Sequence, residues 1–513
     1  MIAYILFLMS IFIFWLIRRN ISELQPPLPP GPKPLPCIGS IITMLRNKPT
    51  FRWIHRLMDE TKTKIICIRL GNIHVIAVSD PIIACEFLKD KDAIFSSRPD
   101  CMSAYLTSEG YLTTVLVQMS DHWKIMRKIL GTKILSLARH NWLQNKRDTE
   151  ADNLIRYIYK RCHTNATVTG VVMNVRTLVQ QYSSNVIRNV MFGSRYFGKG
   201  NTDGGPGDEE IEHINSLLTI LGYVYSFCVT DYLPWLRWIT DFDGHEAIIR
   251  KAIRTARKHQ DRLVDERIQE WKDGLRTKED DLLDVFINLK NPRLTTNQIK
   301  AQILELILAT FDNTANAIEW AMAEMINQPR IFDKAVQELD LVVGKERLVQ
   351  ESDIPNLIYI KSCVKEAFRL HPVAPFNLPH VSLSDTVVAG YFIPKGSHVL
   401  LSRPGLGRNP DVWDDPLTFN PDRHMNHHKE VVLTDHNLQM LSFSTGRRGC
   451  PGVLLGSTIT VMLLARLLQG FTWELPPGDP YVDLKENLQD LMKANPLLAL
   501  VKPRLPHHLY PTC

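Results

Sequence analysis

The sequence has few cysteines and none in closely spaced pairs. Its nine cysteines are scattered along 513 residues, and no two of them are separated by only two residues. Disulfide frameworks and structural zinc sites both depend on clustered cysteines. The spacing therefore argues against both as organisers of the fold and favours a reducing compartment.

The sequence also lacks the signatures of nucleic-acid and dinucleotide binding. Its net charge of +6 is spread along the chain, and no lysine and arginine run carries interleaved aromatic residues. None of its glycine-rich stretches follows the strand–GxGxxG–helix pattern of nicotinamide and flavin dinucleotide sites. We therefore expect no nucleic acid as a partner and no flavin or nicotinamide site in this chain.

Charge is absent from the first 17 residues. The run MIAYILFLMSIFIFWLI reaches the short end of the range needed to cross a bilayer, about 17–25 residues. A cleaved signal peptide would need a basic start and a small-residue cleavage site, and neither is present. Because Arg18 and Arg19 follow at once, we expect a single-pass transmembrane anchor over residues 1–17, with the body in the cytoplasm.

A basic and proline-rich hinge is predicted over residues 18–40. Seven prolines between residues 24 and 40 forbid a helix and favour an extended, semi-rigid segment. By length alone the chain would form roughly three domains. Its pattern beyond the hinge is mainly helical, with β-like runs at residues 65–78 and 386–401. The Gly71-Asn72 pair inside the first run indicates a hairpin.

One long helix is predicted from Thr295, which forms a capping-box pattern with Gln298, to about Asn327. It is apolar nearly all round, so we expect it to pass through the core.

Three polar residues, Asp312, Asn313 and Thr314, interrupt this apolar helix. Buried polar groups lower stability unless they find partners, so the three predict a small polar pocket for water or substrate. The alternative is local bonding of each side chain to the helix backbone.

Cys450 lies in the stretch FSTGRRGCPG, residues 443–452, after Arg447 and Arg448. A helix is predicted to begin near Cys450. Nearby positive charge and the free N–H groups of a helix start both lower a thiol pKa, so the local sequence predicts a thiolate. Glycines at 446, 449 and 452 allow tight turns and the close approach of a flat ligand.

A soft thiolate in such a loop suits iron in a porphyrin. Local chemistry leaves three alternatives open. A catalytic nucleophile would need a histidine base, and none is nearby. A structural cysteine would be buried among apolar neighbours, and a redox sensor is the third.

The same ten residues resemble the haem-binding signature of the cytochrome P-450 superfamily, F-x-x-G-x-R-x-C-x-G. The fixed positions are Phe443, Gly446, Arg448, Cys450 and Gly452. Other landmarks of the superfamily occur in the expected order: a W-x-x-x-R helix at 123–127, an E-x-x-R helix at 366–369 and a later arginine segment at 421–424. The resemblance covers the whole chain.

The resemblance implies a mainly α cytochrome P-450 fold, with a helix-rich body, a small β-sheet lobe and an N-terminal transmembrane anchor. Residues 41–513 would then form one haem-thiolate monooxygenase domain and not several domains. The implied cofactor is haem b (iron protoporphyrin IX), with the Cys450 thiolate as its metal ligand. Electrons would come from NADPH through a partner, NADPH–cytochrome P-450 reductase, at the endoplasmic reticulum membrane and its lipid.

The resemblance also implies roles for single residues. Those implied to contact the haem are Arg98, Trp123, Arg127, His380, Phe443, Arg448, Cys450 and Gly452. Glu366, Arg369 and Arg423 are implied to form a buried structural cluster.

The oxygen-activation motif of the superfamily, A/G-G-x-D/E-T-T, reads ATFDNT here, so the implied catalytic residues are Asp312, Asn313 and Thr314. Asn313 replaces a threonine that helps to deliver protons to dioxygen, and an amide cannot act in the same way. The plant amino-acid N-monooxygenases share this change, with D-N-P where this chain has Thr314 in place of proline. Residues 342–357, 371–382 and 390–410, together with His424, resemble the same branch.

That branch implies two successive N-hydroxylations of an L-amino acid, followed by loss of carbon dioxide and water to give an aldoxime. Phe376 and Asn377 are the candidates for the substrate pocket, which residues 103–120 and 231–236 would cover. The alternative for Phe376 is packing in the core, where phenylalanine is often buried. The alternatives are a conventional plant C-hydroxylase of a terpenoid or phenylpropanoid, and a non-enzymatic haem protein.

Overall fold

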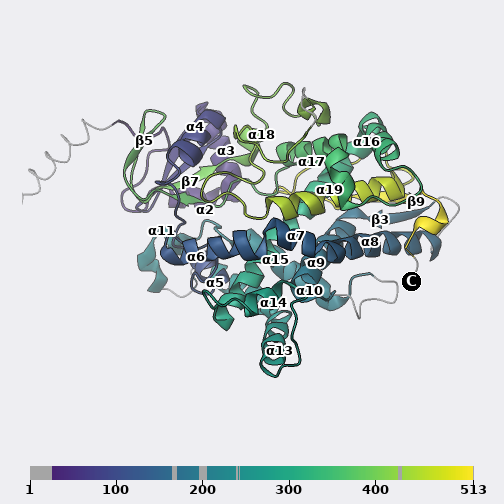
Figure 1. Cartoon of the computed structure of the whole chain (residues 1–513). Coiled ribbons are helices and arrows are strands. Elements are labelled where there is room, and N and C mark those ends of the chain that lie inside the picture. Colours follow the sequence, from purple (N-terminus) through teal and green to yellow (C-terminus); the bar gives the residue numbers. More distant parts are fainter. Residues whose placement is uncertain are drawn as a thin grey trace, which may run out of the picture.

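The computed structural model describes residues 26–164, 170–195, 205–238, 241, 243–425 and 430–511. The predicted anchor over residues 1–17 and the first part of the predicted hinge, residues 18–25, lie outside these residues. Helices dominate the described chain, and short strands form small separate sheets (Figure 1). The prediction of a mainly α fold with a small β lobe is confirmed.

The α-helices are α2 (Ile41–Arg46), α3 (Thr50–Thr61), α4 (Pro81–Cys85), α5 (Met102–Thr107), α6 (Asp121–Ile129), α7 (Leu137–Trp142), α8 (Gln144–Thr164), α9 (Val175–Phe192), α10 (Asp208–Tyr223), α11 (Val229–Tyr232), α12 (His245–Lys258), α13 (Asp261–Lys272), α14 (Leu282–Ile287), α15 (Thr296–Asn327), α16 (Pro329–Val342), α17 (Ile358–Leu370), α18 (Arg403–Gly407) and α19 (Val453–Gly470). The strands are β1 (Ile65–Leu70), β2 (Ile73–Val78), β3 (Val171–Asn174), β4 (His380–Val381), β5 (Thr386–Val388), β6 (Tyr391–Ile393), β7 (His398–Leu401), β8 (Phe471–Glu474) and β9 (Leu498–Pro503). Two short helical turns used below are η2 (Leu130–Ile134) and η6 (Pro421–His424).

The long helix α15 begins and ends where the sequence predicts. The Thr295 hydroxyl accepts a hydrogen bond from the Gln298 N–H at 3.2 Å, and the Gln298 side chain accepts one from the Thr295 N–H at 2.8 Å. This reciprocal pair satisfies N–H groups that a helix start otherwise leaves free. The helix ends at Asn327, ahead of Pro329.

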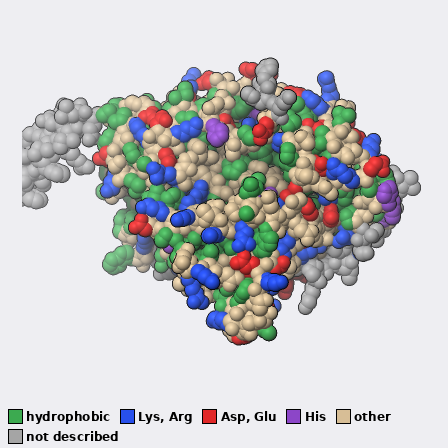
Figure 2. Space-filling model, in the orientation of Figure 1, with side chains coloured by type: hydrophobic (Ala, Val, Ile, Leu, Met, Phe, Trp, Pro, Cys, Tyr) green, Lys and Arg blue, Asp and Glu red, His purple; other side chains and the backbone are tan. Residues whose placement is uncertain are grey.

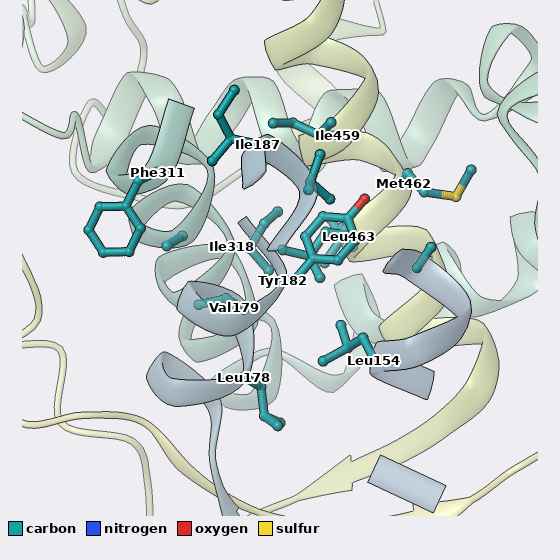
Figure 3. Packing of buried hydrophobic residues seen from close by; sticks show 14 of the residues in the cluster. Leu154, Leu178, Val179, Tyr182, Ile187, Phe311, Ile318, Ile459, Met462 and Leu463 are labelled. Atoms are coloured by element: carbon teal, nitrogen blue, oxygen red, sulfur yellow. The ribbon is translucent and has the colours of Figure 1, made fainter. Parts of the chain in front are cut away.

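Helix α15 forms the main core together with four other helices. α9, α17 and α19 contact α15 directly, and α8 packs on α9 and α19. Figure 3 shows Leu154 of α8, Tyr182 of α9, Ile318 of α15 and Leu463 of α19 converging in this core. Each of these side chains is at least 96% buried. Burying one such aliphatic side chain stabilises a protein by about 1.5–3 kcal/mol, so this packing holds α15 firmly in place.

The β lobe is built from segments that are far apart in the sequence. β1 and β2 form the predicted antiparallel hairpin, with Leu70 opposite Ile73. β7 then pairs in parallel with β2, and β4 pairs with β7, to give a four-stranded sheet. A second sheet, in the order β3–β9–β8, lies at the other end of the molecule (Figure 1).

The described part of the proline-rich segment runs along the β lobe. The Cys67 N–H of β1 donates to the Pro30 carbonyl at 2.8 Å, and the Phe392 N–H of β6 donates to the Pro27 carbonyl at 2.9 Å. Proline cannot donate hydrogen bonds but its carbonyl accepts them, which suits this edge position. These bonds fix the direction in which the chain leaves the lobe towards its N-terminus.

Among the described helices, α19 alone is long and apolar enough to span a membrane, and 72% of it is buried inside the protein, as in a core helix. On the surface, basic and acidic side chains both occur across the face shown in Figure 2.

Candidate active site

The loop that carries Cys450 is held by its own backbone. The Cys450 N–H donates to the Phe443 carbonyl at 2.8 Å, and the Gly449 N–H donates to the Gly446 carbonyl at 3.0 Å. Gly446 has a φ of +72°, and a Cβ at this position would lie 2.6 Å from the Leu88 carbonyl oxygen. The turn therefore requires glycine at position 446.

The helix after the loop, α19, begins at Val453, slightly later than predicted, because Pro451 and Gly452 form a turn first. The Gly452 N–H donates to the Cys450 Sγ at 3.3 Å. Burial raises the pKa of the Cys450 thiol, and the Gly452 N–H, Arg127 and Arg403 only partly oppose this. The nearby charges and N–H groups alone therefore do not deprotonate this thiol. A metal bond is what would deprotonate this thiol.

Cys450 has enough protein around it for its thiol pKa to rise, yet the residue keeps exposed surface, whereas the two residues before it are buried. In α15, Ala309 and Asn313 are also exposed, one turn apart, while most of the helix around them is buried. Exposed surface in the middle of a core helix means that solvent-accessible space reaches that point. The sulfur is thus not packed in hydrocarbon, as a ligand to a flat cofactor requires.

Arginines without carboxylate partners surround this loop. Arg98 and Arg448 donate to backbone carbonyls, and Arg127 donates to the Gly449 carbonyl at 2.6 Å. The Nε of Arg403 is buried without a hydrogen-bond partner. None of the four forms an ion pair with a carboxylate in the described part of the chain. Burial lowers the pKa of Arg448 to about 9 and that of Arg403 to about 10, so both stay charged at neutral pH.

Buried positive charge without a directly bonded carboxylate is unfavourable, so this arginine set fits a ligand that carries carboxylates. The two propionate groups of haem are such carboxylates. The guanidinium of Arg448 also lies over the Trp123 ring, 4.5 Å from its centroid. These residues therefore suit the cofactor predicted from the sequence.

His380 can donate a hydrogen bond to a haem carboxylate only when its ring is charged. Its Nδ1 lies 2.6 Å from the Phe95 carbonyl, which can only accept, so Nδ1 carries the proton. Burial lowers the pKa of His380, which favours the neutral ring, and then Nε2 has no proton to donate. An approaching carboxylate would favour the charged ring.

The predicted structural cluster is present and is larger than the sequence indicated. Glu366 and Arg369 of α17 form two hydrogen bonds, at 2.8 and 2.7 Å, and neither side chain is exposed. Arg423 of η6 donates to Glu366 at 3.0 Å, as predicted, and the His424 ring lies 2.7 Å from the other carboxylate oxygen. Burial alone would raise the pKa of Glu366, but Arg369 and His424 lower it to about 2.

In the polar trio of α15, Asn313 and Thr314 use different partners. The Asn313 amide donates to the Ala309 carbonyl at 2.8 Å, which is local bonding to the helix. The Thr314 hydroxyl lies 3.0 Å from that of Thr460 in α19, which itself donates to the Gly456 carbonyl. Thr314 is buried and joins two helices, whereas Asn313 borders accessible space.

Asp312 is the strongly perturbed acid of the trio. Its Oδ1 is buried without a hydrogen-bond partner. Burial, supported by the charge of Asp490, raises its pKa to about 7, while Arg176 acts in the opposite direction. A carboxyl group that titrates near neutral pH can both hold and release a proton during catalysis.

The two predicted pocket residues differ in character. The Phe376 ring stacks on His55, with centroids 4.9 Å apart, and belongs to the apolar cluster under the β lobe. Asn377 accepts a hydrogen bond from the Leu401 N–H at 2.7 Å, while its Nδ2 is buried with no partner. The structure thus gives Phe376 a packing role and leaves Asn377 with a free donor.

Two charged residues near the site were not singled out from the sequence. Glu305 interrupts the apolar run ILELILATF of α15, and an acid at such a position is a usable signal. Arg403 begins α18 two residues after the end of the apolar strand β7, and a charge in this position is a weaker signal of a functional residue.

Comparison with known proteins settles the family. Residues 29–501 match the cytochrome P450 family. The chain belongs to the cytochrome P450 family. The P450 is 54% identical to a tryptophan N-monooxygenase of Prunus mume over 99% of this chain and 96% of the relative. It is 56% identical to valine N-monooxygenase 1 of Manihot esculenta over 95% of this chain and 89% of the relative.

A phenylalanine N-monooxygenase of Arabidopsis thaliana is 53% identical to this P450 over 96% of this chain and 93% of the relative. The resemblance drawn from the sequence motifs is thus confirmed. Membership of the family implies a haem cofactor with a cysteine thiolate ligand, electrons supplied by a redox partner and a small-molecule substrate.

Proposed function

We propose that this P450 hydroxylates the amino nitrogen of an L-amino acid twice, using dioxygen and electrons from NADPH through NADPH–cytochrome P-450 reductase. The doubly hydroxylated product then loses carbon dioxide and water to give the aldoxime. Relatives named as tryptophan, valine and phenylalanine N-monooxygenases are 53–56% identical to this chain over nearly its full length, and this similarity supports the reaction. The observation that carries it is Asn313, which borders the accessible space where a C-hydroxylating P450 usually has threonine.

Cys450 is the metal ligand in this proposal, and bound haem supplies the activation of dioxygen. The other residues that would hold the haem are Arg98, Trp123, Arg127, His380, Phe443, Arg448 and Gly452. Phe443 closes the cysteine loop through the Cys450 N–H and packs edge-on against Phe368 of α17, with centroids 5.7 Å apart. The loop is thereby tied to the E-x-x-R helix.

Asp312 holds and releases the protons that reach the substrate site. Its unpartnered oxygen and its pKa of about 7 support that role. Asn313 presents an amide to the accessible space, and Thr314 keeps α15 and α19 in register through Thr460. The Nδ2 of Asn377 donates to a polar group of the substrate, because a buried donor without a partner favours such a contact.

The proposed cellular setting follows from the N-terminal sequence. Residues 1–17 would cross the endoplasmic reticulum membrane once, the hinge over residues 18–40 would lie at the lipid surface, and the catalytic domain over residues 41–513 would be cytoplasmic. P450s are typically membrane-associated. Nucleic acid has no part in this proposal.

The reductase would dock near the cysteine loop. Lys128 of α6 and Lys133 of η2 are exposed, and α6 also carries Arg127, which donates to Gly449 of that loop. Such charges steer an acidic partner and set its association rate.

The test is oxime formation by the full chain with its reductase. Microsomes that contain both proteins are supplied with NADPH and each protein amino acid in turn, and products are identified by mass spectrometry. We expect an aldoxime from one or a few amino acids, and none from the Cys450→Ala variant. Absence of oxime from every amino acid, with hydroxylation of a terpenoid or phenylpropanoid, would establish the alternative activity.

A further inference from the structure

Residues 113–117, here called the strap, form a buried segment without helix or strand. Four of the five residues are buried and the fifth, Val115, is partly buried. Backbone N–H and C=O groups inside a protein need hydrogen-bond partners, and an irregular segment cannot supply them itself. The partners of the strap therefore show what holds it.

One carboxylate accepts from three of the five N–H groups of the strap. Glu305 of α15 accepts from the N–H groups of Thr114 and Val115 at 3.0 Å, and from that of Leu116 at 3.4 Å. Gln302 of α15 donates to Glu305 at 3.0 Å and accepts from the Thr114 hydroxyl at 2.8 Å. Glu305 is 6% exposed and forms no ion pair with a basic side chain of the described residues.

Two arginines satisfy the carbonyl groups on the other side of the strap. Arg98 donates to the Val115 carbonyl at 3.2 Å. Arg448 donates to the Val117 carbonyl at 2.8 Å and to the Thr114 carbonyl at 3.4 Å. Both are among the arginines that lack a carboxylate partner.

The Thr114–Val115 and Val115–Leu116 peptide groups thus point their N–H ends at a negative charge and their C=O ends at positive charges. Such an alignment of dipoles is favourable and is strongest away from water. The Glu305 carboxylate lies across a single layer of backbone from the guanidinium groups. Arg98 is also held by the Leu378 and Pro379 carbonyls and Arg448 by the Ser96 carbonyl, so the strap supplies part of the contacts that position the two arginines.

We propose that Glu305 is a positioning residue that holds Arg98 and Arg448, through the strap, in place for the haem carboxylates. The inference rests on the proposed role of these arginines in haem binding and is independent of the substrate. Order in the strap and retention of haem are then linked, and the linkage acts in both directions. A purely structural Glu305 would order the strap without changing how long the haem stays bound.

The test compares the haem-loaded full chain with its Glu305→Gln variant. Hydrogen exchange of peptides that cover residues 113–117 reports on the strap, and transfer of haem to excess apomyoglobin reports on retention. We expect both exchange and transfer to become about tenfold faster, because one neutral acceptor replaces a charged acceptor of several hydrogen bonds. Neither readout requires turnover, so failure of the oxime assay would leave this test intact.

Glu324→Gln is the matched control. Glu324 is also a buried acid of α15, but it pairs with His371 at 2.8 Å and does not contact the strap. This variant breaks a buried pair elsewhere on the same helix, so its loss of stability should act on all buried peptides alike, without faster exchange specific to the strap or a comparable gain in haem transfer. Thr114→Val removes only the bond to Gln302. It should speed both exchange and haem transfer, by a smaller factor than Glu305→Gln. If Glu305→Gln does not fold, the two rates in Thr114→Val test the proposal instead.

Wild-type rates of both exchange and transfer in Glu305→Gln would overturn the proposal. Faster exchange with unchanged haem transfer would also overturn it, because Glu305 would then hold only the strap. Faster transfer in Glu324→Gln to the same extent would show a general loss of stability instead.

Discussion

At the scale of single residues, Asp312 governs the expected pH dependence. A carboxyl group whose pKa is raised to about 7 keeps its proton below that pH and loses it above. As a proton donor, Asp312 should make kcat fall as pH rises through about 7. Asp312→Asn should lower kcat and remove this limb of the pH profile, and Asp312→Glu should restore part of it.

Asp490 offers a control that leaves Asp312 in place. Its charge raises the pKa of Asp312, so Asp490→Asn should move the inflection to lower pH without abolishing activity. An inflection that stays at the same pH in both variants would assign the titration to another group.

A substitution at Asn313 distinguishes N-hydroxylation of an amino acid from conventional C-hydroxylation. A threonine at position 313 could still bond to the Ala309 carbonyl, so Asn313→Thr should fold and bind haem normally. The account predicts at least about tenfold less oxime per NADPH consumed, since an amide that the reaction uses is lost. Oxime yield equal to or above that of the wild type would contradict the role given to Asn313.

At the scale of elements, Glu366 joins α17 to η6. Removing the charge leaves Arg369 buried without its partner, and breaking a buried pair costs about 3–5 kcal/mol. Glu366→Gln should therefore lower the free energy of unfolding by about that amount and reduce haem content, as measured by denaturant titration and absorbance. Asp422→Asn, which breaks an exposed pair with Lys334, should cost less than about 1 kcal/mol.

The same cluster sets a limit on acid stability. The pKa of Glu366 in the folded protein is about 2, below the ordinary glutamate value of about 4.3. Its contribution to stability is therefore complete above the ordinary value and is lost as pH falls towards 2. The difference in unfolding free energy between wild type and Glu366→Gln should shrink over that interval.

The cysteine loop depends on one backbone conformation. At Gly446 an alanine would meet both the φ of +72° and the Leu88 carbonyl. Gly446→Ala should express with strongly reduced haem content. Gly131→Ala, where a Cβ would meet nothing within 4 Å, should keep the wild-type absorbance spectrum.

The elements that the sequence predicted correctly have local signals. The capping box at Thr295 and the Gly71-Asn72 turn of the β1–β2 hairpin each depend on residues a few positions apart. The contact of His424 with Glu366 and that of Glu305 with the strap join residues 58 and about 190 positions apart. Spacing alone carries no information about such contacts, so they became visible only in the folded chain.

The thiol pKa of Cys450 illustrates the same difference. Adjacent arginines and a nearby helix start predicted a lowered value, but burial depends on the whole fold and outweighs them. The family motif nevertheless identified the residue, because the motif reflects the bound cofactor.

At the scale of the whole molecule, helix α15 links the parts of the site. It carries Asp312 and Asn313, contacts α19 behind the cysteine loop through Thr314, and holds the strap through Glu305. The proposed substrate site, the cysteine loop and the arginines proposed to face the haem are therefore all connected to this one helix in the core.

The measurement that tests the central claim most directly is the carbon monoxide difference spectrum of the reduced full-length protein. The account predicts the absorption of a thiolate-ligated haem in the wild type and its complete loss in Cys450→Ala. Persistence of that absorption in Cys450→Ala would contradict the account, because some other residue would then bind the iron.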